Sequence, residues 1–270
     1  MNKKYAIDQS PFYCLRSKKK LLEILRLTEE KLMILTGDDF FNEVKKNGLT
    51  FTPPVKRLRA IHDRIQYHLS RIQTPEYLHS ATKKRSNLTN ALSHSCTSGM
   101  VKTDIKSFFP SISTERIKLF FKIQMKCSNF VAKTLSKLLT YKGALPKGSP
   151  CSPLLSFLVN KPMFDEINSI CNQVSTILTV YVDDCSMSMP GLNRNLLRRV
   201  NGVISRHGYG HHKHRIYKPS QPKVVTGVVL LEKDKIRAAK KVYRETRRHI
   251  KSPTNKGKLS YIDYVESYNL

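Results

Sequence analysis

The apolar positions of the N-terminal region follow the spacing of amphipathic helices. Leucines separated by charged residues recur along residues 18–35, at Leu21, Leu22, Leu25, Leu32 and Leu35. Because residues three or four positions apart share one face of a helix, this spacing predicts one amphipathic helix over residues 18–35. The same spacing from Leu58 to Ile72 predicts a second helix, and the arginines at its polar positions make that face cationic.

The pattern changes to alternation after a polar connector. Residues 76–100 contain few aliphatic side chains and predict a loop-rich segment. In the segment GMVKTDIKSFFPSIS, which starts at Gly99, apolar or hydroxyl residues alternate with Lys102, Asp104 and Lys106. Alternation with a period of two predicts a short β-strand that runs into a turn at Pro110.

The rest of the chain mixes helical and strand patterns. Residues 143–153 are too rich in Gly and Pro for either element, and hairpins are predicted over residues 176–189 and 224–236. Helical periods cover several further stretches, at residues 114–140, 154–171, 193–207, 237–251 and 259–270. Strands and helices in this mixed order predict an α+β fold.

The charge balance narrows the class of partner. The 270 residues include 48 Lys and Arg against 20 Asp and Glu, which gives a formal net charge of +28. Such an excess causes self-repulsion in the compact state unless a polyanion offsets it, so nucleic acid is the expected partner. A single basic cluster is usually a solvated face, but clusters along the whole chain favour an extended cationic surface.

The sequence also gives expectations about location and cysteine chemistry. No apolar run approaches the roughly 18 residues of a membrane span, and the first residues lack the apolar core of a signal peptide. We therefore expect a cytoplasmic protein with no membrane partner. The six cysteines form no C-x-x-C pair and lie far apart, which predicts buried, reduced thiols. With 40% hydrophobic residues, the chain is long enough for one large domain or two small ones.

Two adjacent acids interrupt the apolar stretch TILTVYVDDCSMSM, residues 176–189. The alternation on both sides predicts two strands, which places Asp183 and Asp184 at the tip of a hairpin. An Asp-Asp pair alone is most often a turn or a helix cap, and Asp38–Asp39 is expected to be a pair of that kind. The third acid, Asp104, ends its own predicted strand, so adjacent strands of one sheet would bring it beside the hairpin tip.

Three converging carboxylates point to a metal site. They would repel one another and raise one another's pKa values unless a divalent cation neutralised them. Hard oxygen ligands suit Mg²⁺, which keeps part of its water shell and takes further ligands from substrate phosphates. Two such ions would activate a 3′-hydroxyl and stabilise a leaving pyrophosphate. The acids therefore predict nucleotidyl transfer with two Mg²⁺ ions, or with Mn²⁺ in their place.

The segments around these acids resemble the palm of a reverse transcriptase. YVDD follows DIKSFFPSI and LPKGSPCSPLLS in the order that this family keeps. NALSH at residues 90–94 and VTG at residues 225–227 are similar to the N-A-x-x-H and V-T-G signatures of the bacterial retron-type branch. The resemblance extends over roughly residues 50–230. Any one of these motifs can arise by chance, but all of them in this order rarely do.

The resemblance implies a right-hand polymerase fold of the α+β class, with fingers, palm and a short thumb. The palm would be an antiparallel sheet of the RRM or ferredoxin-like kind that carries the YVDD hairpin. The implied boundaries are residues 1–98 for the N-terminal helices and fingers, 99–230 for the palm, with finger-side helices at about 114–145, and 231–270 for the helical thumb. A thumb of this length implies a weak grip on the primer-template duplex or help from a partner.

The resemblance also assigns roles to individual residues. Asp104, Asp183 and Asp184 would be catalytic, and together with the backbone carbonyl of Ile105 they would hold the metal ions. Phe109 falls where the family keeps an aromatic side chain that excludes a 2′-hydroxyl and so favours dNTPs. The other implied nucleotide-binding positions are Pro146, Lys147, Gly148, Ser149, Pro150 and Lys213. The positions implied to contact primer, template or RNA are Lys56, Arg57, Arg59, Asn90, His94, Tyr181, Thr226 and Gly227.

Several positions depart from the family or leave alternatives open. Leu49 stands where the family commonly has Arg or Lys, so the triphosphate contact would fall to the cations at Lys56, Arg57 and Arg59. Lys147 would either hold a phosphate or lie in solvent, and Phe108 and Phe109 are alternatively both core residues. Lys213 falls where the family has a lysine that would protonate the departing pyrophosphate. No trusted metal-ligand spacing joins the neighbouring histidines, for which a solvated loop is expected: His211, His212 and His214.

The leading hypothesis is a retron-type RNA-directed DNA polymerase. It would copy part of a structured noncoding RNA into single-stranded, multicopy DNA from dNTPs, in antiphage defence with an effector protein encoded nearby. One alternative is another defence or mobile-element reverse transcriptase, which would make DNA either with or without a template. The other is an inactive palm that binds RNA as a scaffold, and replacing Asp183 with Asn distinguishes that scaffold from an enzyme.

Overall fold

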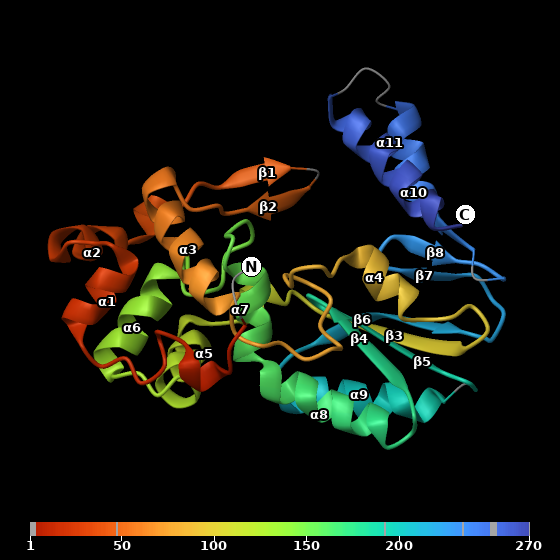
Figure 1. Ribbon diagram of the computed structural model, residues 1–270, viewed down its shortest axis with the longest axis horizontal. Coiled ribbons are helices and arrows are strands. Elements are labelled where there is room, and N and C mark those ends of the chain that lie inside the picture. The colour runs from red at the N-terminus through yellow and green to blue at the C-terminus, as the bar shows by residue number, and fades with distance from the viewer. Residues whose placement is uncertain (1–3, 47, 192, 234, 249–252, 270) are drawn as a thin grey trace. The chain divides into compact units, whose positions relative to one another are not determined.

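The computed structural model describes residues 4–46, 48–191, 193–233, 235–248 and 253–269. The chain divides into two compact units, one built from residues 1–75 and 107–164 and the other from residues 76–106 and 165–270. Figure 1 labels the helices and strands of both units. The boundaries between these two units differ from the fingers, palm and thumb boundaries expected from the sequence. The expected boundaries describe functional parts of the chain, and they stay a prediction.

Helices dominate the first unit. They are α1 (Lys18–Leu25), α2 (Glu29–Leu35), α3 (Lys56–Leu69), α5 (Thr114–Leu119), α6 (Asn129–Leu138) and α7 (Ser152–Val159). A π-helical segment, Phe120–Gln124, continues α5. Short 3-10 turns lie at Ile7–Gln9, Asp38–Phe40 and Phe109–Ser111. The helices share a core that includes the fully buried side chains of Phe12, Ile65, Phe121 and Leu135.

The single helix expected over residues 18–35 is wrong, because the chain breaks at Arg26. Arg26 takes a left-handed conformation with a φ of 52° and ends α1. Thr28 then begins α2 by accepting a hydrogen bond from the backbone N–H of Lys31. Leucines of both short helices are buried, so the apolar period continues across the break and does not reveal it.

A short hairpin in the first unit was not expected from the sequence. β1 (Val44–Lys46) pairs antiparallel with β2 (Leu49–Phe51), and Gly48 between them has a positive φ of 73°. Both strands are largely exposed, and the side chain of Leu49 is among the exposed ones. Alternating burial, which is the sequence signal of a strand, is therefore missing here.

A four-stranded antiparallel sheet forms the centre of the second unit. Its strands are β3 (Gly99–Ile105), β4 (Ile177–Tyr181), β5 (Asp184–Met189) and β6 (His211–Tyr217), in the order β4-β5-β3-β6. α8 (Lys161–Asn172), which belongs to this unit from residue 165 onward, and α9 (Arg194–Arg206) lie side by side on one face (Figure 1). Glu166 joins them by binding Arg206 and His207. This β-α-β-β-α-β order is the ferredoxin-like arrangement.

The other face of this sheet packs on a smaller sheet. Strands β7 (Lys223–Val225), β8 (Val228–Leu230) and β9 (Ile236–Ala238) form it, with α4 (Asn87–Leu92), α10 (Lys240–Arg248), α11 (Pro253–Glu266) and a final 3-10 turn, Ser267–Asn269. One core cluster joins α4, the three strands and α11 to β3: Leu88, Ala91, Cys96, Met100, Val225, Val228, Leu230, Ile236 and Val265. The hairpin predicted over residues 224–236 is present as β7–β8, and β9 is a third strand that the prediction lacked.

Two further expectations concern helices and thiols. Within the described residues, no helix is both long enough and apolar enough to cross a membrane. All six cysteines are free thiols, and only Cys14 among them is exposed. Burial raises the pKa of the Cys171 thiol to about 12, so this thiol stays protonated and unreactive at neutral pH.

Candidate active site

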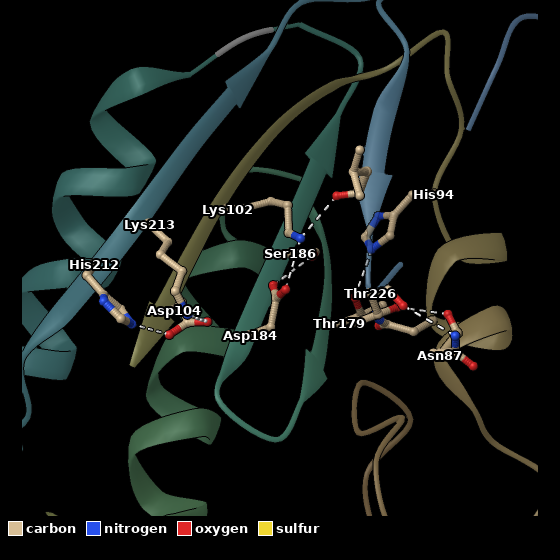
Figure 2. Close-up of polar contacts among 12 residues, drawn as sticks. Asn87, His94, Lys102, Asp104, Thr179, Asp184, Ser186, His212, Lys213 and Thr226 are labelled. Carbon is tan, nitrogen blue, oxygen red and sulfur yellow. Dashed lines mark hydrogen bonds and ion pairs between the residues drawn. The ribbon is translucent and has the colours of Figure 1, made fainter. Parts of the chain in front are cut away.

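Three acids meet at one end of the four-stranded sheet. Asp104 lies near the end of β3 directly opposite Asp184, the first residue of β5, so both side chains lie on the same face (Figure 2). Asp183 lies in the turn before β5, and its carbonyl oxygen accepts a hydrogen bond from the Ile105 backbone N–H at 2.9 Å. Backbone pairing of β3 with the β4–β5 hairpin therefore brings the three predicted acids together.

The turn between β4 and β5 is short and strained. Tyr181 pairs with Asp184, so Val182 and Asp183 alone form the turn, and Val182 has a φ of 60°. A β-branched residue rarely takes this left-handed conformation, and such strain is typical of functional sites. The hydroxyl of Ser80 accepts a hydrogen bond from the Val182 N–H at 3.0 Å. The turn is thus held in a conformation that its own sequence disfavours.

Strand β6 places two basic side chains beside Asp104. His212 Nε2 lies 2.5 Å from Asp104 Oδ1, and Lys213 Nζ donates to Oδ2 at 3.1 Å (Figure 2). Consecutive strand residues normally point to opposite faces. Here the pairing of β3 with β6 shifts by one residue beyond Lys102, and Lys213 takes a positive φ of 52°. This β-bulge turns both side chains toward one carboxylate.

The solvated loop expected for the histidine group is wrong. His211, His212 and His214 belong to strand β6, where His212 pairs with Asp104 across the sheet. His211 Nδ1 lies 2.8 Å from His214 Nε2, and burial followed by the charge of His214 lowers the pKa of His211. Alternation does not reveal this strand, because its residues are polar on both faces and an edge strand need not alternate.

Asp184 has its own cation, which sequence reasoning missed. Lys102 of β3 donates from Nζ to Asp184 Oδ2 at 2.9 Å, and the Ser186 hydroxyl donates to Oδ1 at 3.3 Å (Figure 2). Lys102 lies two residues before Asp104, on the same face of β3. Because residues two apart in a strand share a face, the alternation could have predicted that Lys102 lies near the acids.

The environment of Asp183 raises its pKa. Burial, followed by the charge of Asp104, raises the pKa of Asp183 to about 6. Among the described residues, no group of three or more His, Cys, Asp and Glu side chains is arranged to hold a metal ion. Mg²⁺ needs only one or two carboxylates when substrate phosphates complete its ligands, so the metal ligands expected from the sequence stay a prediction.

The two retron-type signatures contact each other in the second unit. Asn90 donates from Nδ2 to Thr226 Oγ1 at 3.1 Å, and the Thr226 hydroxyl donates to the Asn87 carbonyl at 2.9 Å. His94 lies between Thr179 of β4, at 2.8 Å, and Ser188 of β5, at 2.7 Å. Asn90 and His94 are only 1% and 6% exposed, so they support the turn at Thr226 and the hairpin instead of facing solvent.

The Thr226–Gly227 turn lies at one end of this arrangement. Both residues have positive φ, 44° and 89°, and the turn closes the Val225–Val228 pair, as a type I′ hairpin requires. Thr226 is unusual at such a position, and its hydrogen bonds to α4 hold it there. Both residues are half-buried, as is Tyr181 beside Asp184.

The remaining predicted nucleotide-binding residues belong to the first unit. Phe108 is 2% exposed and stacks on the half-buried Phe109 with 6.2 Å between ring centroids, so Phe108 is a core residue. Ser149 is buried and bonds to His62 at 2.7 Å, whereas Lys147 is half-buried and its carbonyl accepts from the Thr52 N–H. Gly148 has a φ of 104° and lies against the backbone of Pro53. Pro146 is buried and Pro150 is half-buried.

The cations predicted to contact phosphate lie at the start of α3. Lys56, Arg57 and Arg59 are all exposed, and Arg59 lies 3.9 Å from Asp63. They too belong to the first unit, where they can meet a polyanion without losing buried contacts.

Comparison with known proteins gives a consistent result. A family model described as reverse transcriptase (RNA-dependent DNA polymerase) matches residues 53–211. The chain is 25% identical over 250 residues to the retron Ec86 reverse transcriptase of Escherichia coli, which covers 88% of this chain and 77% of that protein. It is 30% identical over 148 residues to the retron Se72 reverse transcriptase of Salmonella heidelberg, which covers 53% of this chain and 38% of that protein.

A solved structure shares the fold. Telomerase from Candida albicans, in complex with a TWJ fragment of telomeric RNA, superposes with a TM-score of 0.50 over 77% of this chain and 49% of its own, at 9% identity. At this identity the likeness concerns the polymerase-type fold with mixed helices and strands.

Proposed function

This chain belongs to the reverse transcriptase family of RNA-directed DNA polymerases and is similar to its retron members, and we propose that it copies part of a structured noncoding RNA into single-stranded DNA. The proposal includes a cytoplasmic location, a role in antiphage defence and an effector protein encoded nearby. It also includes the fingers, palm and thumb division, with the β4–β5 hairpin in the palm.

The observation that carries the proposal is the convergence of Asp104, Asp183 and Asp184 on one end of the sheet. Asp104 and Asp183 would hold Mg²⁺, with Mn²⁺ as an alternative, and the Ile105 carbonyl would add a ligand. Bound metal would supply the charge that activates a primer 3′-hydroxyl and neutralises the triphosphate. Asp184, held by Lys102, would complete the negative field that attracts these ions.

The chain's own residues would handle the proton and the sugar. Lys213 lies 3.1 Å from Asp104, close enough to the acids to protonate a departing pyrophosphate. Phe109 would stack under the sugar and favour dNTPs over NTPs. Residues Pro146–Pro150 would line the nucleotide pocket, with Lys147 available for a phosphate.

RNA and primer would bind along the cationic surface. Lys56, Arg57 and Arg59 are exposed and free of buried contacts, which supports a phosphate-binding role for the start of α3. The Thr226–Gly227 turn would contact the primer end, and Tyr181 would lie beside it. Asn90 and His94, which are buried, would act by holding this turn and the hairpin.

Substitution of one acid tests the enzyme. Asp183→Asn should abolish dNTP incorporation on an RNA template while RNA binding persists. Asp39→Asn is the matched control, because Asp39 belongs to the chain's other Asp-Asp pair and is exposed. Primer extension by the Asp183→Asn protein at the wild-type rate would show that the assigned site is wrong.

Analysis of bound nucleic acid tests the retron assignment. The protein purified from its host should carry a branched or covalently joined RNA-DNA species, detectable by sequencing before and after RNase treatment. DNA of random sequence would instead favour untemplated synthesis. RNA alone, with no DNA and no dNTP incorporation, would favour a binding scaffold.

A further inference from the structure

Lys102 connects the candidate active site to the second sheet of the same unit. Its ammonium donates to Asp184 Oδ2 at 2.9 Å and to the Val224 carbonyl oxygen of β7 at 3.1 Å (Figure 2). Val224 lies two residues before Thr226. We propose that Lys102 is a positioning residue that fixes the Thr226–Gly227 turn relative to Asp184, and thereby aligns the primer end with the site of nucleotide addition. This inference rests on the proposed function.

Lys102 is much more buried than Lys213, the other lysine beside the acids. Its side chain is 10% exposed, against 65% for Lys213. Buried lysines are rare unless paired, and replacing a buried ion pair with apolar residues of similar volume is often neutral or stabilising. Met100, two residues earlier on the same face, shows that this face accepts an apolar side chain. Stability alone therefore accounts poorly for a lysine here.

The second partner of Lys102 follows from the geometry of the β7–β8 hairpin. Antiparallel pairs alternate between hydrogen-bonded and non-hydrogen-bonded. The Val225–Val228 pair next to the two-residue turn is hydrogen-bonded, so the Val224–Val229 pair is not. Because β7 is the edge of its sheet, the Val224 carbonyl points away from β8 and receives no donor from a neighbouring strand on that side. Lys102 supplies a donor instead.

The connection has a functional consequence because the two ends have different roles. Asp184 belongs to the acids that would bind metal, whereas Thr226 and Gly227 would contact the primer end. Transfer requires the 3′-hydroxyl to lie in line with the incoming nucleotide, and a misplacement of about 1 Å can cost about 10²-fold in rate. One side chain that bonds both parts keeps their separation fixed.

The fold does not depend on this connection alone. Asn87 and Asn90 hold Thr226 from α4, and His94 holds strands β4 and β5. Removing the Lys102 ammonium leaves Asp184 without its ion pair and should lower stability, but these other contacts should keep the unit folded while the alignment of the turn with Asp184 loosens.

The test compares Lys102→Met with Lys223→Met in the full chain, by single-nucleotide extension of a primer annealed to RNA. Lys223 is a matched control because it is also buried, at 0% exposed, and within the described residues its ammonium bonds only to the carbonyls of Cys96 and Gln221. We expect Lys102→Met to lower kcat about 10²-fold with little change in the KM for dNTP or in primer-template affinity. Lys223→Met should lower the melting temperature and leave the kcat of the folded protein unchanged.

A conservative variant and several named outcomes distinguish the positioning role from a structural one. Lys102→Arg keeps the charge and should recover part of the lost kcat. A Lys102→Met protein with the kcat of an active wild type would overturn the positioning role and leave the proposed function intact, whereas a wild type without extension would overturn the proposed function. Equal kcat losses in both Met variants would show a merely structural role. If Lys102→Met does not fold, Lys102→Gln replaces it, and wild-type kcat in that variant overturns the inference.

Discussion

Asp104 and Asp184 lie directly opposite each other on β3 and β5, but their carboxylates contact different basic side chains. Asp104 binds His212 and Lys213 of β6, whereas Asp184 binds Lys102, which precedes Asp104 on β3. Each carboxylate is therefore oriented by its own partner. Substitutions of these partners, and of the groups that hold the turns, test separate parts of the site.

Lys213→Met should slow nucleotide addition. The substitution removes the ammonium that lies 3.1 Å from Asp104, and loss of a general acid typically lowers the rate about 10²–10⁴-fold. Single-turnover incorporation of one dNTP measures this effect. Lys218→Met, which removes an exposed lysine just after β6, is the control, and an equal rate loss in both variants would contradict a specific role for Lys213.

Asn90→Ala should impair primer extension more than it impairs stability. The variant loses the hydrogen bond to Thr226, worth about 0.5–1.5 kcal/mol. It also removes the Asn90 Oδ1 atom, which is buried without a partner among the described residues, so the free energy of unfolding should change little. Urea unfolding and primer extension measure the two effects. Thr226→Ala should give the same extension defect, and an additive double variant would argue against a shared contact.

Stability should fall on mild acidification because His94 is buried as a neutral ring. Burial lowers the pKa of His94 from 6.5 to about 3, so the unfolded chain binds a proton more readily than the folded one. Stability from this residue is present above pH 6.5 and is lost as the pH falls toward about 3. The free energy of unfolding of His94→Gln should depend less on pH in this window, and an identical pH profile to wild type would refute the assignment.

Val182→Gly should stabilise the folded protein. Val182 has a positive φ, and this left-handed conformation costs a residue with a side chain about 1–2 kcal/mol, which glycine avoids. Glycine in turn loses more backbone entropy on folding, which costs about 0.5–1 kcal/mol, so a small net stabilisation remains. Thermal unfolding should therefore show a small rise in melting temperature. Val182→Ala keeps a Cβ atom and with it the strain, so an equal rise in the alanine variant would mean that the backbone of the turn is not the cause.

Replacing Lys56, Arg57 and Arg59 with alanine should weaken RNA binding and reduce its dependence on salt. Each lost phosphate contact lowers the slope of log K against log salt concentration by about 0.7–0.9. Titration of a labelled RNA at several salt concentrations measures that slope. The control replaces three other exposed lysines of the first unit with alanine, at Lys19, Lys20 and Lys31, and so removes the same charge. An equal loss of slope in this control would indicate a diffuse cationic surface.

Much of this protein could be predicted from local pattern. The alternation around Asp104, Asp183 and Asp184 predicted strands that end at acids, and strand β3 and hairpin β4–β5 lie where those patterns stand. The helical periods after residue 114 likewise match α5, α6, α8 and α9. These predictions succeeded because each depends on residues a few positions apart, whose side chains share one face of the same element.

The order of residues along the chain was enough to identify the candidate site residues, because the acids, the N-A-x-x-H segment and the V-T-G segment can be recognised in it. The partners of these residues became known from the folded chain. Lys102 reaches Asp184 and β7, His212 and Lys213 share Asp104, and Asn90 reaches Thr226. These contacts join residues far apart in the chain through strand register and one bulge, and no local spacing of apolar and polar residues encodes which strands become neighbours.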